Sequence, residues 1–148
     1  MKKKTICLLG LVIVLLICMI AYFKPLSFSN MVSQHSQISM ILNVYGIKDG
    51  QPDIDVVEYK DITAEQKSAF LTLLEKYTYR RTLGTLFSNG TMAGIGTRML
   101  TVHVFDETLG SNVFVISAKE IVVNGKNYRL KNAEEFLTQI IALMEQTG

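Results

Sequence analysis

The chain has no tryptophan, two prolines and two cysteines in 148 residues. Both cysteines, Cys7 and Cys18, lie in a long apolar run near the N-terminus. The remainder of the chain therefore has no thiolate nucleophile, no cysteine ligand for zinc and no means of forming a disulfide. We expect a domain held together by its hydrophobic core alone, and about 110 residues are enough for one such core.

The chain also lacks a large net charge of either sign. The formal net charge is +2, and three of the fifteen basic residues are Lys2, Lys3 and Lys4. From residue 24 onward, the chain has twelve basic and thirteen acidic side chains. This balance gives no electrostatic case for binding nucleic acid.

An unbroken apolar run covers residues 5–23, with the three lysines before it and Lys24 and Pro25 after it. As a helix it would be roughly 28 Å long, close to the thickness of a bilayer core. The run predicts an N-terminal transmembrane helix, with residues 1–23 as the membrane anchor. The lysine bias predicts a single-pass protein of the cell membrane, with a cytoplasmic N-terminus and an extracellular C-terminal domain.

The same charged start and apolar centre are typical of a cleaved secretory signal, which would make the protein secreted. Ala21 is the only small residue at the end of the run, and this disfavours cleavage. Leu15, Leu16 and Ile17 precede Cys18 where lipidation would need a small residue. All of these outcomes export the same domain.

Residues 24–36 are rich in serine, asparagine and glutamine, and we expect a polar stalk there. The extracytoplasmic domain is expected at residues 37–148. Its predicted elements are strands at 38–45 and 54–59, a helix at 63–76, strands at 79–87, 98–105, 112–117, 120–123 and 126–130, and a helix after residue 132. This order, β-β-α-β-β-β-β-β-α, predicts an α+β domain, with an antiparallel sheet and two helices packed on one face.

Local signals mark these elements. Thr63 and Gln66 form a capping box, and Asn132 with Glu135 has the same spacing before the last helix. Apolar stripes at helical spacing follow the two caps, at Phe70, Leu73, Leu74 and Tyr77 and at Leu137, Ile140, Ile141 and Met144. Asn124-Gly125 indicates a tight hairpin between two strands, because both residues tolerate a positive φ.

Motifs of catalysis or of metal binding are weak. His103 stands in the middle of a predicted strand, and no HExxH spacing accompanies it. The acidic residues of the 49–55 segment lack the glycine and the glutamate of a calcium loop, so a solvated loop is the favoured interpretation. The segment 94–96 begins like a dinucleotide motif, but its third glycine is missing. We therefore predict no metal, no cofactor and no enzyme activity.

One segment favours binding to a partner. Tyr77, Tyr79 and Arg81 would share one face of a strand, and Arg80 would lie on the other. Tyrosine and arginine are common at interface hot spots, so Tyr77, Tyr79, Arg80 and Arg81, with the neighbouring loop at 89–96, are the candidate contact surface. The alternative is that the tyrosines cover the edge of the core while the arginines extend into solvent.

Four segments carry a resemblance: the lysine-rich start, ISMILNVY, LLEKYTYRRTL, and VVNGKNYRL followed by a helix. Through them the chain resembles a family of uncharacterised small exported domains of Gram-positive bacteria, a domain of unknown function. The resemblance covers roughly residues 37–146 and implies an exported, membrane-associated location. It implies no catalytic residues.

Together these features predict a membrane-anchored extracytoplasmic binding or interaction module. Its partners would be the membrane, through the single N-terminal span, and an envelope protein. The alternatives are an envelope-associated inhibitor or immunity-type protein, and an envelope hydrolase. The hydrolase is disfavoured, because general acid–base catalysis needs a placed histidine or carboxylate pair and no spacing marks one.

Overall fold

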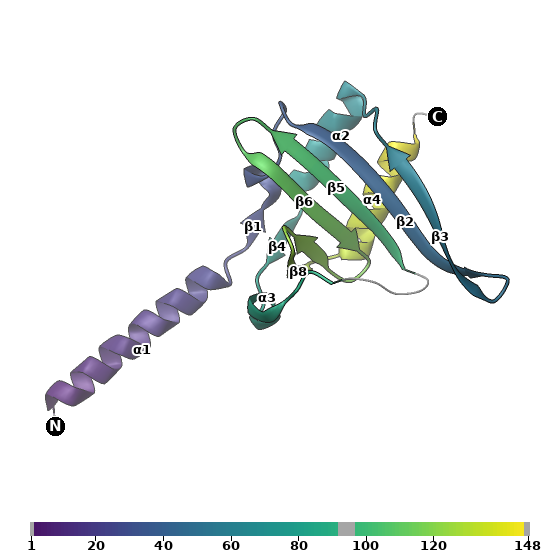
Figure 1. Cartoon of the computed structure of the whole chain (residues 1–148). Coiled ribbons are helices and arrows are strands. Elements are labelled where there is room, and N and C mark those ends of the chain that lie inside the picture. The colour runs from purple at the N-terminus through teal and green to yellow at the C-terminus, as the bar shows by residue number, and fades with distance from the viewer. Residues whose placement is uncertain (1, 92–96, 147–148) are drawn as a thin grey trace.

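The computed structural model describes residues 2–91 and 97–146, with side chains from Ile6 onward. Eight strands form one antiparallel sheet in the order β1-β4-β8-β7-β6-β5-β2-β3 (Figure 1). The strands are β1 (Leu26–Ser27), β2 (Gln37–Lys48), β3 (Gln51–Tyr59), β4 (Thr78–Arg80), β5 (Arg98–Asp106), β6 (Gly110–Ser117), β7 (Ile121–Val123) and β8 (Lys126–Leu130). The helices are α1 (Lys2–Tyr22), the 3-10 helix η1 (Phe28–Asn30), α2 (Ala64–Glu75), α3 (Leu83–Phe87) and α4 (Ala133–Glu145).

Helices α2 and α4 lie on the same face of the sheet, and the core fills the space between them and the strands (Figure 1). The predicted stripe of α4 is buried in full, and the stripe of α2 is buried except for the half-exposed Tyr77. The capping box of α2 forms as predicted: the Gln66 amide donates to the Thr63 hydroxyl, and the Thr63 amide donates to the Gln66 side chain. The α+β character predicted from the sequence is confirmed.

The predicted transmembrane helix requires a correction. Crossing a bilayer takes about 20 consecutive apolar residues in a helix. In the part of the chain that the structure describes, no helix meets the combined demands of length and apolar character.

The predicted order of elements is also wrong, because residues 79–87 do not form one strand. The strand β4 ends at Arg80, and α3 begins after Thr82. The reason is a second capping box: the Thr82 hydroxyl accepts from the Thr85 amide, and the Thr85 hydroxyl accepts from the Thr82 amide. Threonine at the last position replaces the usual Glu or Gln, so the residue pattern does not reveal this helix start.

Residues 24–36, predicted as a polar stalk, are part of the fold. Phe28, Met31 and Val32 are buried, and the ring of Phe28 lies 5.0–5.7 Å from those of Tyr79, Phe114 and Phe136.

A buried carboxylate fastens this segment to the sheet. The hydroxyls of Ser33 and Ser36 donate to Asp106 at 2.5 and 2.7 Å. The amides of Thr108 and Leu109 donate to its other oxygen at 2.9 Å. Because these bonds favour the ionised form, they hold the pKa of Asp106 well below its usual range.

Two turns differ in their detail from the predictions. Strands β2 and β3 are joined by Asp49-Gly50 alone, both with positive φ. Asp-Gly is a strong hairpin signal, and it extends both strands beyond their predicted ends.

Asn132 precedes α4 in the left-handed region and makes no side-chain cap, although its side chain donates to Glu135. The Asn124-Gly125 hairpin forms as predicted.

Candidate binding surface

In the part of the chain that the structure describes, no helix covers the face of the sheet opposite α2 and α4 (Figure 1). Residues paired across antiparallel strands share a face, so the register identifies the side chains on this outer face. They form rows such as Glu58–Ile41–Thr101–Val115 and Val56–Asn43–Met99–Ser117. Ile54 and Phe105 extend the apolar part of this face and are exposed.

The strand β3 forms the end of the sheet, and no described strand pairs with its outer edge. Ile54 and Val56 are exposed on the outer face, and Val57 is exposed on the helix-side face. Asp53 and Asp55 share the helix-side face with Val57. Alternate residues of β3 turn their backbone groups away from β2, so the strand offers hydrogen-bonding groups and apolar side chains at an open edge.

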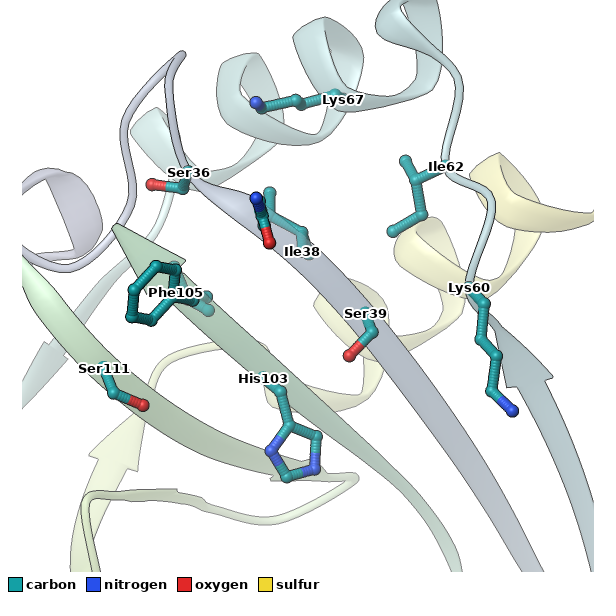
Figure 2. A pocket seen from close by; sticks show the side chains of 11 residues that line it. Ser36, Ile38, Ser39, Lys60, Ile62, Lys67, His103, Phe105 and Ser111 are labelled. Atoms are coloured by element: carbon teal, nitrogen blue, oxygen red, sulfur yellow. The ribbon is translucent and has the colours of Figure 1, made fainter. Parts of the chain in front are cut away.

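A pocket of about 550 Å³ lies where β3 ends (Figure 2). Pairing between β2 and β3 extends only to Met40 and Tyr59, so residues 37–39 of β2 have a described strand neighbour on one side alone. The pocket occupies this notch, below the start of α2. Its lining is Ser36, Gln37, Ile38, Ser39, Lys60, Ile62, Lys67, His103, Val104, Phe105 and Ser111.

The cationic groups of the pocket already have partners on the protein. The Lys60 ammonium lies 2.5 Å from a Glu58 carboxylate oxygen, and the hydrogen bond and charge of Glu58 raise the pKa of Lys60. Lys67 donates to the backbone oxygen of Gln34 at 2.6 Å. Both ammonium groups are thus held at the rim, where they can hydrogen-bond to a carboxylate or to backbone carbonyls of a ligand.

Ser39 and His103 are directly opposite each other on β2 and β5, and Figure 2 shows both side chains on the same side of the sheet. A serine beside a histidine is the residue pair that nucleophilic catalysis uses. Because His103 lies beside Ser39, an enzymatic role of this protein is best tested by replacing His103.

The structure separates the four residues predicted as a contact surface. Tyr79 is buried: its ring packs on Phe28 and its hydroxyl donates to the sulfur of Met31. Burial raises the pKa of Tyr79, and the Tyr79 ring is not offered to a partner. Tyr77 is half-buried, with its ring 4.4 Å from that of Phe136.

Arg80 is exposed, and Arg81 is half-buried with its guanidinium 5.4 Å from the centre of the Tyr22 ring. The two arginines thus remain at the surface while the tyrosines belong to the core. Of the neighbouring loop at 89–96, residues 92–96 lie outside the described part of the chain, and so does the 94–96 glycine motif.

Sequence reasoning did not identify β3 as an edge strand. Its acidic residues are typical of a solvated loop, although the Asp49-Gly50 signal indicates a hairpin there. Which strand lies at an edge could not be found from local signals. Among the described residues, no group of three or more His, Cys, Asp or Glu side chains gathers as metal ligands.

Comparisons of the chain with family models, with curated proteins and with solved structures found no match.

Proposed function

We propose that this protein is an exported, non-enzymatic binding module that takes an extended segment of a partner protein onto the free edge of β3. The observation that supports it is the nine-residue β3 edge, which has no described neighbour and exposes Ile54, Val56 and Val57. An edge strand can pair with a further strand, and the Pro52, Asp53 and Asp55 side chains of β3 restrict which strand can do so. Strand addition would supply main-chain hydrogen bonds, and the side chains would supply specificity.

The two faces of β3 define the chemistry of the partner. A strand paired with β3 would place alternate side chains beside Asp53 and Asp55 on one face and beside Ile54 and Val56 on the other. The complementary segment alternates lysine or arginine with apolar residues. Opposite charges across a strand pair stabilise it, while like charges destabilise it.

A second copy of this chain fits the edge poorly. When a strand pairs with itself in antiparallel fashion, each face meets the same face of the other copy. In the register centred on Ile54, Asp53 and Asp55 of one copy would then lie against those of the other. This repulsion favours a different, basic partner over self-association.

Export is proposed from the sequence alone. Lysines at positions 2–4 followed by the apolar run are typical of segments that direct a chain across the cell membrane. The domain would then work at the outer side of that membrane. An inhibitor or immunity-type protein would use the same edge, with an enzyme or toxin as the bound partner.

The location is tested by adding protease to intact cells. Residues beyond Lys24 should be degraded, because an exported domain is accessible to protease from outside the cell. Separating cells, membranes and medium then shows whether the domain is retained or released. A domain that is protected inside intact cells would contradict the proposal.

The partner is tested by photo-crosslinking in living cells from position 54. The expected result is capture of one protein through an extended segment of alternating basic and apolar residues, and loss of that capture in Asp53→Lys/Asp55→Lys. Position 109, on the β5–β6 turn, is the matched control, because it is exposed but lies away from β3.

Two outcomes would contradict this proposal. Equal capture from positions 54 and 109 would mean that β3 is not the contact. Turnover of an envelope substrate by the purified protein, with loss in His103→Ala, would instead support the hydrolase and assign the Ser39–His103 pair a catalytic role.

A further inference from the structure

The helix α3 presents an apolar tip to solvent. Leu83, Leu86 and Phe87 are 67%, 54% and 89% exposed, although α3 has only five residues. Phenylalanine is more often buried, and adjacent exposed apolar side chains mark sites of interaction.

This exposure is built into the fold. The capping box of Thr82 and Thr85 fixes the first turn of α3, and Thr85 is buried. After the helix, the Ser88 hydroxyl accepts from the amide of Asn127, and the Gly90 amide donates to the Asn127 side chain at 3.0 Å. The tip is therefore held firmly against β8.

Arginines lie just before the apolar tip in the chain and on the strand β8 that α3 contacts. Arg80 lies directly opposite Arg129 across β4 and β8, and Arg81 follows in the chain. Neither Arg80 nor Arg129 has an acidic partner among the described residues. Two like charges in one cross-strand pair are destabilising, so an external anion at this place would stabilise the pair. The sequence has no Asp or Glu between Glu75 and Asp106 to supply one from the same segment.

The chain brings a second apolar surface to the same place. Arg81 contacts Tyr22 at the end of α1, and the large apolar side chains of α1 from Ile6 to Ile20 are exposed. Figure 1 shows α1 leaving the domain on the side where α3 lies.

From these observations we propose that α3 docks on the surface of a bilayer containing anionic lipids. Leu83, Leu86 and Phe87 enter the boundary between headgroups and acyl chains, while Arg80 and Arg81 bind headgroup phosphates. A tip of three side chains is too small for a stable protein interface, which buries about 800 Å² on each partner. Docking here leaves β3 free, because β3 is at the opposite edge of the sheet.

The absence of tryptophan makes the test direct, since Phe87→Trp introduces the only one in the full-length chain. With vesicles containing phosphatidylglycerol, the emission of the introduced indole should move to shorter wavelength and be quenched by brominated lipids. Ile47→Trp is the matched control, because position 47 is 66% exposed at the far hairpin. Its emission should not change.

The charge requirement is tested by adding Arg80→Glu to the Phe87→Trp chain. We expect the ratio of docked to undocked indole at position 87 to fall by at least about fivefold on anionic vesicles, with no change for the matched reversal Lys48→Glu. Flotation confirms that the chain is bound to vesicles in each case.

Three results would overturn the proposal. The first is unshifted emission from the Phe87→Trp chain when it floats with anionic vesicles. The second is an equal shift in the Phe87→Trp and Ile47→Trp chains. The third is a shift that appears without lipid and grows with protein concentration, because this would assign the tip to contact between copies of the chain.

Discussion

Replacing Phe28 with alanine tests whether residues 24–36 belong to the folded core. The side chain is fully buried, and its ring contacts those of Tyr79, Phe114 and Phe136. Phenylalanine-to-alanine changes in cores cost about 3–5 kcal/mol, and the cost rises with the cavity that remains. Because the three neighbouring rings are held by two strands and α4, they cannot easily close the cavity. We expect a loss of about 4–5 kcal/mol in the free energy of unfolding.

The assay is urea unfolding of the chain from Lys24 onward, followed by circular dichroism. Phe87→Ala is the matched control: Phe87 is 89% exposed, so its loss should change stability by no more than about 0.5 kcal/mol. A loss below about 1 kcal/mol for Phe28→Ala would refute the reasoning, because it lies outside the range for a buried phenylalanine.

The same reasoning applies to removal of the whole segment. A chain of residues 37–148 lacks Phe28, Met31 and Val32, whose burial contributes roughly 5–9 kcal/mol at about 1.5–3 kcal/mol each. Domains of this size have only about 5–15 kcal/mol of net stability. The shorter chain should therefore unfold at a much lower urea concentration than the chain from Lys24 onward, and an unchanged midpoint would contradict this expectation.

Three further predictions follow from single sites. Because folding lowers the pKa of Asp106, the ionised carboxylate stabilises the fold at any pH above about 3.9, the pKa of aspartate in an unfolded chain, and this stabilisation is lost as the pH falls below that value. Asp106→Asn should therefore be less stable than the unchanged chain at pH 7, and its stability should fall less steeply as acid is added. Gly90→Ala should cost roughly 1–3 kcal/mol in thermal or urea unfolding, because φ is +73° and a Cβ would lie 2.9 Å from the Gly125 oxygen. Leu74→Ala and Ile140→Ala should each cost about 2–5 kcal/mol, and losses below about 0.5 kcal/mol would mean that the buried faces of α2 and α4 are wrongly assigned.

Only part of the candidate site was accessible to sequence reasoning. Tyr77 and Tyr79 were predicted to share a surface with Arg81, yet the two tyrosines contact Phe136 and Phe28, which lie more than 45 positions away in the chain. Arg80 remained exposed, but its position opposite Arg129 depends on the pairing of β4 with β8. Local alternation gives the face of a side chain within its strand. It does not give the neighbour of that strand.

The sequence by itself determined what depends on residues a few positions apart. Thr63 and Gln66 set the start of α2, the stripe of α4 set its buried face, and Asn124-Gly125 set a hairpin. The physical reason is that capping, helical period and positive φ act within one turn of the chain. Tertiary structure alone decided that β3 is an edge, that Phe28 is a core residue and that α3 is exposed beside arginines. These properties arise from the order of strands in the sheet, and contacts between distant segments fix that order.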